Sequence, residues 1–436
     1  MRWASLTILF LLVLAGIAAV FFVRGEHRVN AGGASVINQG TINRAPAQPA
    51  AAYLYYTLKQ STGFVLARAL KGSSGQPLGN PQPVAAFGDD FGLAESDSVL
   101  NMQLSPDGRY LAINGTRDHG EQVWIYDTQK MTLSLTPSAV LGNFLHWLPA
   151  GGNSGNSGTT GHTFLYRPMF PLGPTAPMDG NVWNPGLWEV DAASGAHENI
   201  DIGVPSAYLI DAASSPDGSQ IIYSTTAGLD LGSDTWLMSS NGSGVRHLFS
   251  NPGGSLSGAC GAPCNTLAAL FTWSPDGKSI VYERLADSPT PFLPAGLWVM
   301  NSAGGQQQRL ADADGGHGYA PVWSPDSRKI AFVMRTNAGD HQANISMQSL
   351  QSAIAVVDVT TGHAWTVASA NQTGMQLNLN PAWTAGSATI TFTASNPVNR
   401  LLGGSPRYWS AQVTGIQSRL LVSPLTPLLA HIIATS

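Results

Sequence analysis

The sequence predicts an all-β protein, a β-propeller of four-stranded antiparallel blades preceded by one N-terminal transmembrane helix. Two observations predict the propeller. A pattern of turn and strand around Ser-Pro-Asp-Gly returns at intervals of about 40 to 70 residues, and a second hairpin pattern follows each copy. An uncharged apolar run near the amino terminus predicts the helix.

The apolar run, Trp3–Val23, carries no charge and is long enough to cross a bilayer as a helix. We therefore expect residues 1–24 to form a membrane anchor, with a signal peptide as the alternative, because the two share most features. Residues 25–52 are rich in Ala, Gly, Asn and Pro without periodicity, which predicts a flexible tether. The propeller then occupies residues 53–436.

The first repeated unit is a tight turn followed by a strand. Its clearest copies are LSPDGRYLAI, SSPDGSQIIY, WSPDGKSIVY and WSPDSRKIAF, and weaker copies begin at Trp147 and Trp383. In this turn Pro presets φ, Asp bonds the local backbone and Gly accepts a positive φ. We therefore interpret the four aspartates as turn residues, not as catalytic acids or metal ligands: Asp107, Asp217, Asp276 and Asp326.

The second repeated unit is a hairpin, as in LWVMNSAGGQQQRL, where two strand patterns flank a polar turn. Nine of the twelve tryptophans occupy one position in each unit: Trp147, Trp273, Trp323 and Trp383 in the first, and Trp124, Trp188, Trp236, Trp298 and Trp409 in the second. Their strands alternate apolar and polar residues, so we expect these rings to pack between blades.

The number of blades depends on the chain ends. Six copies of the first unit predict six blades, but YLYYTLKQSTGFVLARAL, from Tyr53, is a seventh hairpin of the second kind. The carboxy-terminal LLAHIIATS could complete its blade and close the ring. This favours seven blades with a composite closing blade, and six blades is the alternative.

WSPDGKSIVYER followed by LWVMNSAGGQQQRL resembles the TolB-like, WD-like propeller repeat, over nearly everything from about residue 53 onward. The motif is specific for the fold and says little about function. The resemblance implies a protein-binding platform in the bacterial envelope. Because a membrane span stands here in place of a preceding α/β domain, the partners of that family are not carried over.

The search for catalytic chemistry finds no Gly-x-Ser-x-Gly elbow, no His-Glu-x-x-His and no phosphate-binding loop. The inner-strand segments LFTW, APVW, NPAW and NMQL contain no acid. We therefore expect no enzyme, no cofactor and no metal, and predict a non-catalytic platform for a protein or peptide partner in the cell envelope. The alternative is a propeller hydrolase, a metal-dependent lactonase or a glycan-processing enzyme, with its site in the central channel.

Candidate binding residues come from the long connections, which the topology places on one face. Arg167, Arg284 and Arg335 each follow the second strand of a repeat, and basic residues there could bind carboxylate or phosphate groups. Solvated strand-end charges are the alternative. Trp183 and His317 belong to connections on the same face.

Composition limits the partners and the compartment. Charged residues make up 11% of the chain, and the net charge of −5 without a basic stripe argues against nucleic acid. The two cysteines, Cys260 and Cys264, could form a disulfide in an oxidising compartment, with two unpaired thiols as the alternative. We expect a single-pass membrane protein with the propeller outside the cytoplasm, either periplasmic or on the cell surface.

Overall fold

The computed structural model describes residues 53–435 except 61–62, 73–76, 89–101, 118–119, 137–140, 150–160, 170–185, 205–206, 229–230, 254–264, 287–291, 316–318, 385, 397–406, 415–416 and 423–429. The predicted anchor and tether therefore lie outside the described residues. Within the described part of the chain, none of the helices has the length and apolar character needed to span a bilayer.

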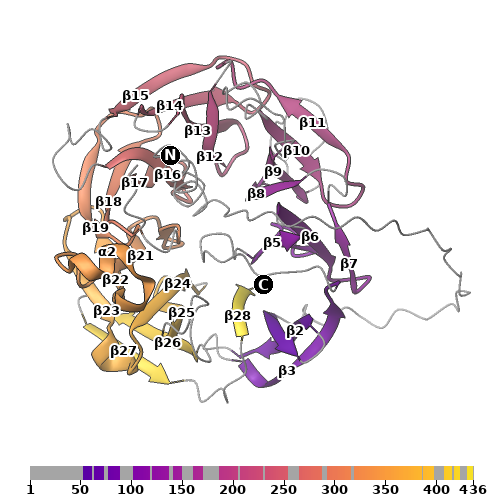
Figure 1. Cartoon of the computed structure of the whole chain (residues 1–436), viewed down its shortest axis with the longest axis vertical. Coiled ribbons are helices and arrows are strands. Elements are labelled where there is room, and N and C mark those ends of the chain that lie inside the picture. The colour runs from indigo at the N-terminus through magenta and orange to yellow at the C-terminus, as the bar shows by residue number, and fades with distance from the viewer. Residues whose placement is uncertain are drawn as a thin grey trace, which may run out of the picture.

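Seven four-stranded antiparallel sheets form a ring, and we number these blades along the chain (Figure 1). Blade 1 contains β28 (Ala430–Thr435), β1 (Tyr53–Gln60), β2 (Gly63–Lys71) and β3 (Pro77–Ala86), from the centre outward. Blade 2 contains β4 (Met102–Leu104), β5 (Tyr110–Arg117), β6 (Gly120–Asp127) and β7 (Thr132–Leu135). Blade 3 contains β8 (Leu141–Trp147), β9 (Thr163–Met169), β10 (Leu187–Asp191) and β11 (His197–Ile200).

The remaining four blades follow the same order. Blade 4 contains β12 (Tyr208–Ser214), β13 (Gln220–Thr226), β14 (Gly232–Ser239) and β15 (Arg246–Pro252). Blade 5 contains β16 (Asn265–Trp273), β17 (Ser279–Ala286), β18 (Ala295–Asn301) and β19 (Gln308–Ala313). Blade 6 contains β20 (Val322–Trp323), β21 (Lys329–Arg335), β22 (Ser352–Asp358) and β23 (Ala364–Ala368). Blade 7 contains β24 (Leu377–Trp383), β25 (Thr389–Ser395), β26 (Arg407–Thr414) and β27 (Gln417–Val422).

The closing blade confirms the prediction of seven blades with a composite last one. Its assembly differs in detail from the expectation. The hairpin from Tyr53 supplies the second and third strands, because β28 pairs with β1 on its inner side and β3 pairs with β2 on its outer side. The segment that follows Lys71 thus contains the outer strand. The carboxy-terminal segment supplies one inner strand.

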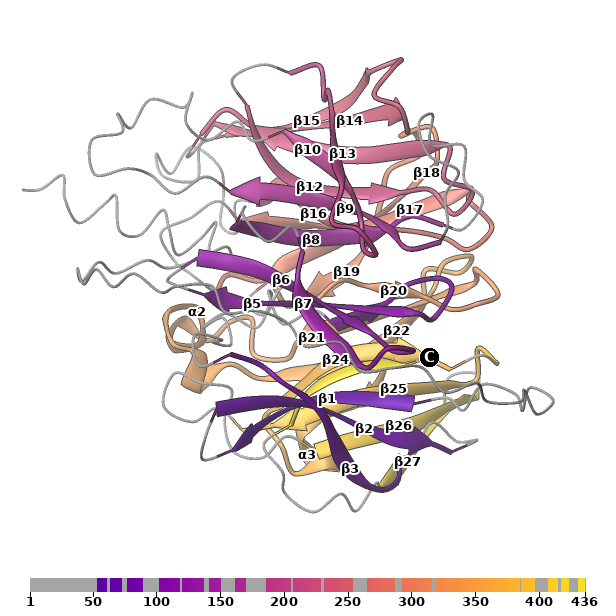
Figure 2. The same ribbon diagram turned by 90° about the vertical axis from the view of Figure 1, so that its right-hand side faces the viewer.

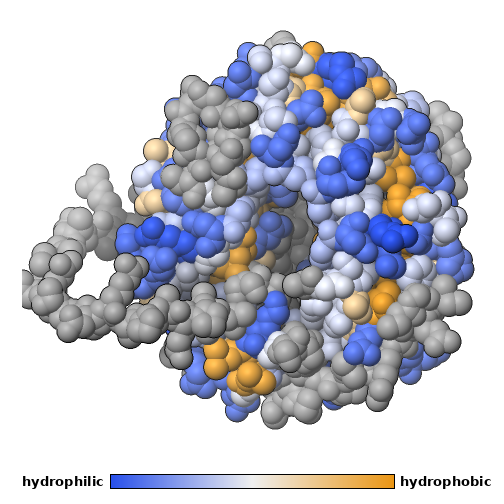
Figure 3. Space-filling model, turned by 180° about the vertical axis from the view of Figure 1, so that it is seen from behind, coloured by the Kyte–Doolittle hydropathy of each residue, from blue (hydrophilic) through white to orange (hydrophobic). Residues whose placement is uncertain are grey.

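The two faces of the ring carry different connections. The first and third turns of each blade lie on one face, which we call the turn face. The connections between the second and third strands, and those between blades, lie on the other, the loop face. There the short helices α2 (His341–Ile345) and η3 (Met347–Ser349) join β21 to β22, at the left of Figure 2, and α3 (Ala370–Thr373) follows β23. Figure 3 shows the turn face, which is hollowed at its centre. Not every long connection lies on the loop face, because in blade 3 the first turn is also long: 15 residues, 148–162, separate β8 from β9.

Each boundary between neighbouring blades buries an apolar cluster. At the boundary of blades 5 and 6, for example, Val281 and Leu297 pack with Ile330 and Phe332. Tryptophan adds a repeated hydrogen bond, since Nε1 of Trp273 donates to the carbonyl of Ala213 in the preceding blade at 3.2 Å. Trp147, Trp323 and Trp383 make the equivalent bond to Gln103, Thr272 and Val322. The prediction that these rings pack between blades is confirmed.

Candidate functional site

In several blades the second strand carries a polar residue at the same position. This residue lies eight residues after the proline of the repeated turn, and in blade 3 at the equivalent place. In blade 2 it is Asn114, whose side-chain amide exchanges hydrogen bonds with the backbone of Phe144 at 3.1 and 3.2 Å. In blade 4 it is Ser224, which donates to the carbonyl of Ala268 at 2.6 Å. Each of these side chains bonds the inner strand of the next blade. The position therefore links neighbouring blades where the inner strands bulge.

Arg167 occupies this position in blade 3. It is only 7% exposed, and its Nη1 donates to the carbonyls of Ile210 at 2.8 Å and Leu209 at 3.4 Å, in the inner strand of blade 4. The next residue, Asp211, accepts a hydrogen bond from the backbone of Phe271 in blade 5 at 3.0 Å. Burial raises the pKa of Asp211, against the opposing effects of that hydrogen bond and of the Arg167 charge. The four inner-strand segments named from the sequence contain no acid, but Asp211 lies on a further inner strand, β12.

Arg335 ends the second strand of blade 6 and forms a buried ion pair. Its Nε and Nη2 lie 3.1 and 2.9 Å from Oδ1 of Asp314, and both side chains are 0% exposed. Nη2 also donates to the carbonyl of Phe292 at 2.8 Å, and the backbone N–H of Phe292 donates to the carbonyl of Asn344 in α2 at 3.1 Å. Arg335 thus ties the long connections of blades 5 and 6 together.

Glu283 occupies the recurring polar position in blade 5. It is 1% exposed, and neither of its carboxyl oxygens has a hydrogen-bond partner in the structure as described. Burial raises the pKa of Glu283 well above its usual range, and the negative charge of Asp314 raises it further. At this blade boundary the recurring polar position is a buried carboxyl group beside an ion pair. We call Glu283, Asp314 and Arg335 the 5/6 cluster.

Arg284 points to the opposite side of the same strand, toward blade 4. Its guanidinium carbon lies 3.8 Å from the centroid of the Trp298 ring and 5.4 Å from that of Phe249, and Nη2 donates to Gln307 at 2.6 Å. The three predicted arginines therefore lie at three different blade boundaries, and the structure does not bring them together. Trp183, His317, Cys260 and Cys264 lie outside the described residues.

The four aspartates of the repeated turn all lie on the turn face. Each accepts a hydrogen bond from the serine two residues before it and from the backbone two residues after it. For Asp217 and Asp276, the serine hydroxyl is the largest cause of a lowered pKa. The carboxylates are engaged within their own turns.

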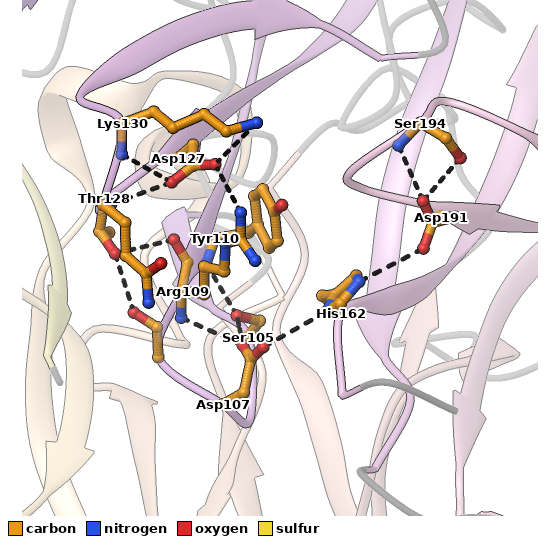
Figure 4. A network of polar contacts seen from close by, with 12 residues as sticks. Ser105, Asp107, Arg109, Tyr110, Asp127, Thr128, Lys130, His162, Asp191 and Ser194 are labelled. Atoms are coloured by element: carbon orange, nitrogen blue, oxygen red, sulfur yellow. Dashed lines mark hydrogen bonds and ion pairs between the residues drawn. The ribbon is translucent and has the colours of Figure 1, made fainter. Parts of the chain in front are cut away.

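One of these turns also contacts the next blade (Figure 4). Nδ1 of His162 lies 3.3 Å from Asp107 in blade 2, and its Nε2 lies 3.5 Å from Asp191 in blade 3. The His162 ring also lies against Tyr110, with 5.1 Å between centroids. Across the described residues, no group of three or more His, Cys, Asp or Glu side chains is arranged to hold a metal ion.

Sequence reasoning missed Asp211, Glu283 and Asp314, and also His146 on β8, whose pKa is lowered to about 4 by burial. A signal existed for two of them. Asp211 lies five residues before Pro216, inside the inner strand of a repeat copy that lacks the tryptophan. Glu283 stands where Asn114 and Ser224 also break an apolar strand pattern. Nothing in the sequence pairs Asp314 with Arg335.

No protein-family model matches the sequence. A 63-residue stretch is 35% identical to the Tol-Pal system protein TolB of Alcanivorax borkumensis, covering 14% of this chain and 13% of that protein. The match thus spans only a small part of that relative. In fold the chain is similar to TolB from Acinetobacter baumannii, with 13% identity, coverage of 89% of this chain and 67% of that chain, and a TM-score of 0.44.

Two similar structures are named as enzymes. An oligogalacturonate lyase in complex with manganese is 14% identical, with coverage of 81% and 85% and a TM-score of 0.49. The periplasmic gluconolactonase of Pseudomonas aeruginosa is 12% identical, with coverage of 88% and 99% and a TM-score of 0.47. The expectation that this chain is not an enzyme is therefore corrected, because enzymes also use this fold and missing motifs do not exclude activity.

The sheets and their closure define the chain as a seven-bladed β-propeller. The resemblance to TolB-like propellers expected from the repeats is confirmed by the 63-residue match to TolB.

Proposed function

We propose that this chain is a binding propeller of the cell envelope, which receives a protein or peptide partner on its loop face. The observation that carries the proposal is the joining of two long connections into one surface. Phe292, from the blade 5 connection, bonds both Arg335 and α2 of the blade 6 connection. Beside this junction Ile345 of α2 is 48% exposed, and elsewhere on the loop face Leu231, in the blade 4 connection, is 63% exposed. Exposed apolar side chains on a surface that hydrogen bonds hold in place are suited to anchor a partner.

The test is capture of a partner from envelope extract by the immobilised full chain. We expect Ile345→Asp to reduce the captured amount at least tenfold, which corresponds to a loss of about 1.4 kcal/mol or more. The matched control is Leu78→Asp, because Leu78 is 62% exposed and lies at the turn-face end of the outer strand of blade 1. Equal loss in both variants, or no partner at all, would count against binding on the loop face.

An enzyme with its site at the inner strands is the second candidate, and Asp211 is the observation that favours it. A carboxyl group with a raised pKa in an inner strand is suited to general acid–base work. We expect any turnover on a panel of lactones and glycosides to fall about a hundredfold or more in Asp211→Asn. The Asn side chain can still accept the hydrogen bond of Phe271, so the fold is retained. Turnover that is unchanged in Asp211→Asn would exclude this residue.

A further inference from the structure

The boundary of blades 5 and 6 differs from its neighbours at the recurring polar position. At three earlier boundaries this side chain bonds the backbone of the next inner strand, as Asn114, Arg167 and Ser224 do. Blade 6 has the shortest inner strand of the ring, β20, which begins only at Val322. At the Glu283 boundary the inner strand of the next blade is therefore shorter than the inner strands that bond the equivalent side chain at the three earlier boundaries. Asp314 and Arg335 lie in this region instead.

The direction of Glu283 follows from the alternation along β17. Val281, two residues earlier, packs with Trp323 and Phe332 of blade 6, so Glu283 points to the same side. The backbone N–H of Asp314 donates to Val333 of blade 6 at 2.9 Å, which places Asp314 at the same boundary. Asp314 is also the ion-pair partner of Arg335, whose Nη1 is buried and has no partner within the described structure. An unpartnered acid thus lies at the boundary where Asp314 forms its buried ion pair with Arg335.

The net charge of the 5/6 cluster limits which ligand can bind at Glu283. Asp314 and Arg335 neutralise each other, so an ionised Glu283 would leave one negative charge without compensation at 1% exposure. A proton removes this charge. A compact cation of charge +1 also compensates it and can contact both carboxyl oxygens. A divalent ion would leave an excess positive charge and would need a larger set of anionic ligands.

We propose that the 5/6 cluster is an exchange site in which a compact monovalent cation, either an alkali-metal ion or a primary ammonium group, replaces the proton of Glu283. In the exchange the Glu283 O–H bond breaks, the proton goes to water, and the cation contacts the resulting carboxylate. Asp314, which is ion-paired with Arg335, is the charged group that acts on Glu283 across the boundary. Arg284 lies on the other side of the strand, against Trp298.

The test is thermal unfolding of the full chain in chloride salts of sodium, potassium, methylammonium and tetramethylammonium at equal ionic strength. Tetramethylammonium is the control, because its charge is the same and its size prevents close contact with a carboxylate. At about pH 8 we expect Tm in at least one of the small cations to exceed that in tetramethylammonium by roughly 2–4 °C. The difference should vanish at about pH 5, where the proton occupies the site, and in Glu283→Gln.

The four salts also separate the two sources of the cation. An effect of sodium or potassium identifies an alkali-metal ion, and an effect of methylammonium alone identifies an ammonium group. Equal Tm in all four salts, or a difference that persists in Glu283→Gln, would overturn the proposal. A second measurement does not depend on the variant. Adding the active salt to weakly buffered protein should release up to about one proton per chain, and no release would also overturn it.

Discussion

Replacing Arg335 with methionine (Arg335→Met) is expected to lower the free energy of unfolding by about 3–5 kcal/mol. The substitution keeps an unbranched side chain of similar length but leaves the carboxylate of Asp314 without its cation at 0% exposure. It also removes the hydrogen bond to the carbonyl of Phe292, which holds the loop-face connection of blade 5. Urea unfolding followed by tryptophan fluorescence measures the loss.

Two comparisons show whether the loss comes from the uncompensated charge. Adding Asp314→Leu to Arg335→Met should recover more than half of it, because a buried ion pair replaced by apolar groups costs little. Arg284→Met, at the next boundary, should cost only about 1 kcal/mol, since Arg284 is partly exposed and contacts Trp298 by a cation–π interaction. A single Arg335→Met variant within about 1 kcal/mol of the original protein would contradict a stabilising ion pair.

The stability of the protein is expected to fall as pH rises, and Glu283→Gln should remove most of this fall. The pKa of Glu283 is raised in the folded state, so the folded protein holds a proton that the unfolded chain releases. The stabilisation is complete below the unfolded pKa and is lost as pH rises through the folded one. Between those two values the loss is about 1.4 kcal/mol for each pH unit.

The measurement is the urea midpoint at pH values from about 4.5 to 8.5, in tetramethylammonium chloride so that no small cation competes with the proton. The matched control is Glu198→Gln, on the exposed outer strand β11, which should follow the original protein. A flat pH profile in the original protein, or the same slope in Glu283→Gln, would show that Glu283 does not carry the proton.

The repeats predicted most of the fold because each unit carries its own turn chemistry and strand pattern. The closing blade was the exception. A hairpin pattern specifies that two strands pair, but not which of its two edges faces the centre. Closure of the ring decides that, because β28 pairs with β1 and leaves β3 on the outside.

In two repeat copies a serine replaces the glycine of the turn, and only the tertiary structure explains how it is accommodated. Ser327 and Ser387 stand where other copies have glycine, and both adopt a positive φ, 60° and 52°. Their hydroxyls accept hydrogen bonds from the backbone of Asp276 and Asp326 in the preceding blade, each at 3.1 Å. The bond between blades offsets the strain of a side chain in this conformation.

By itself the sequence determined the strands, the turns and the tryptophan positions, because these depend on neighbours within one repeat. It did not determine the 5/6 cluster. Glu283 and Arg335 come from two blades and Asp314 from the connection between them, and their burial follows from the packing of those blades against each other. From the sequence, a single Glu or Arg in a strand pattern is interpreted as a surface charge. Only the packing of two blades shows that water is excluded from it. Tertiary structure alone decided which charges are buried and where a ligand could compensate them.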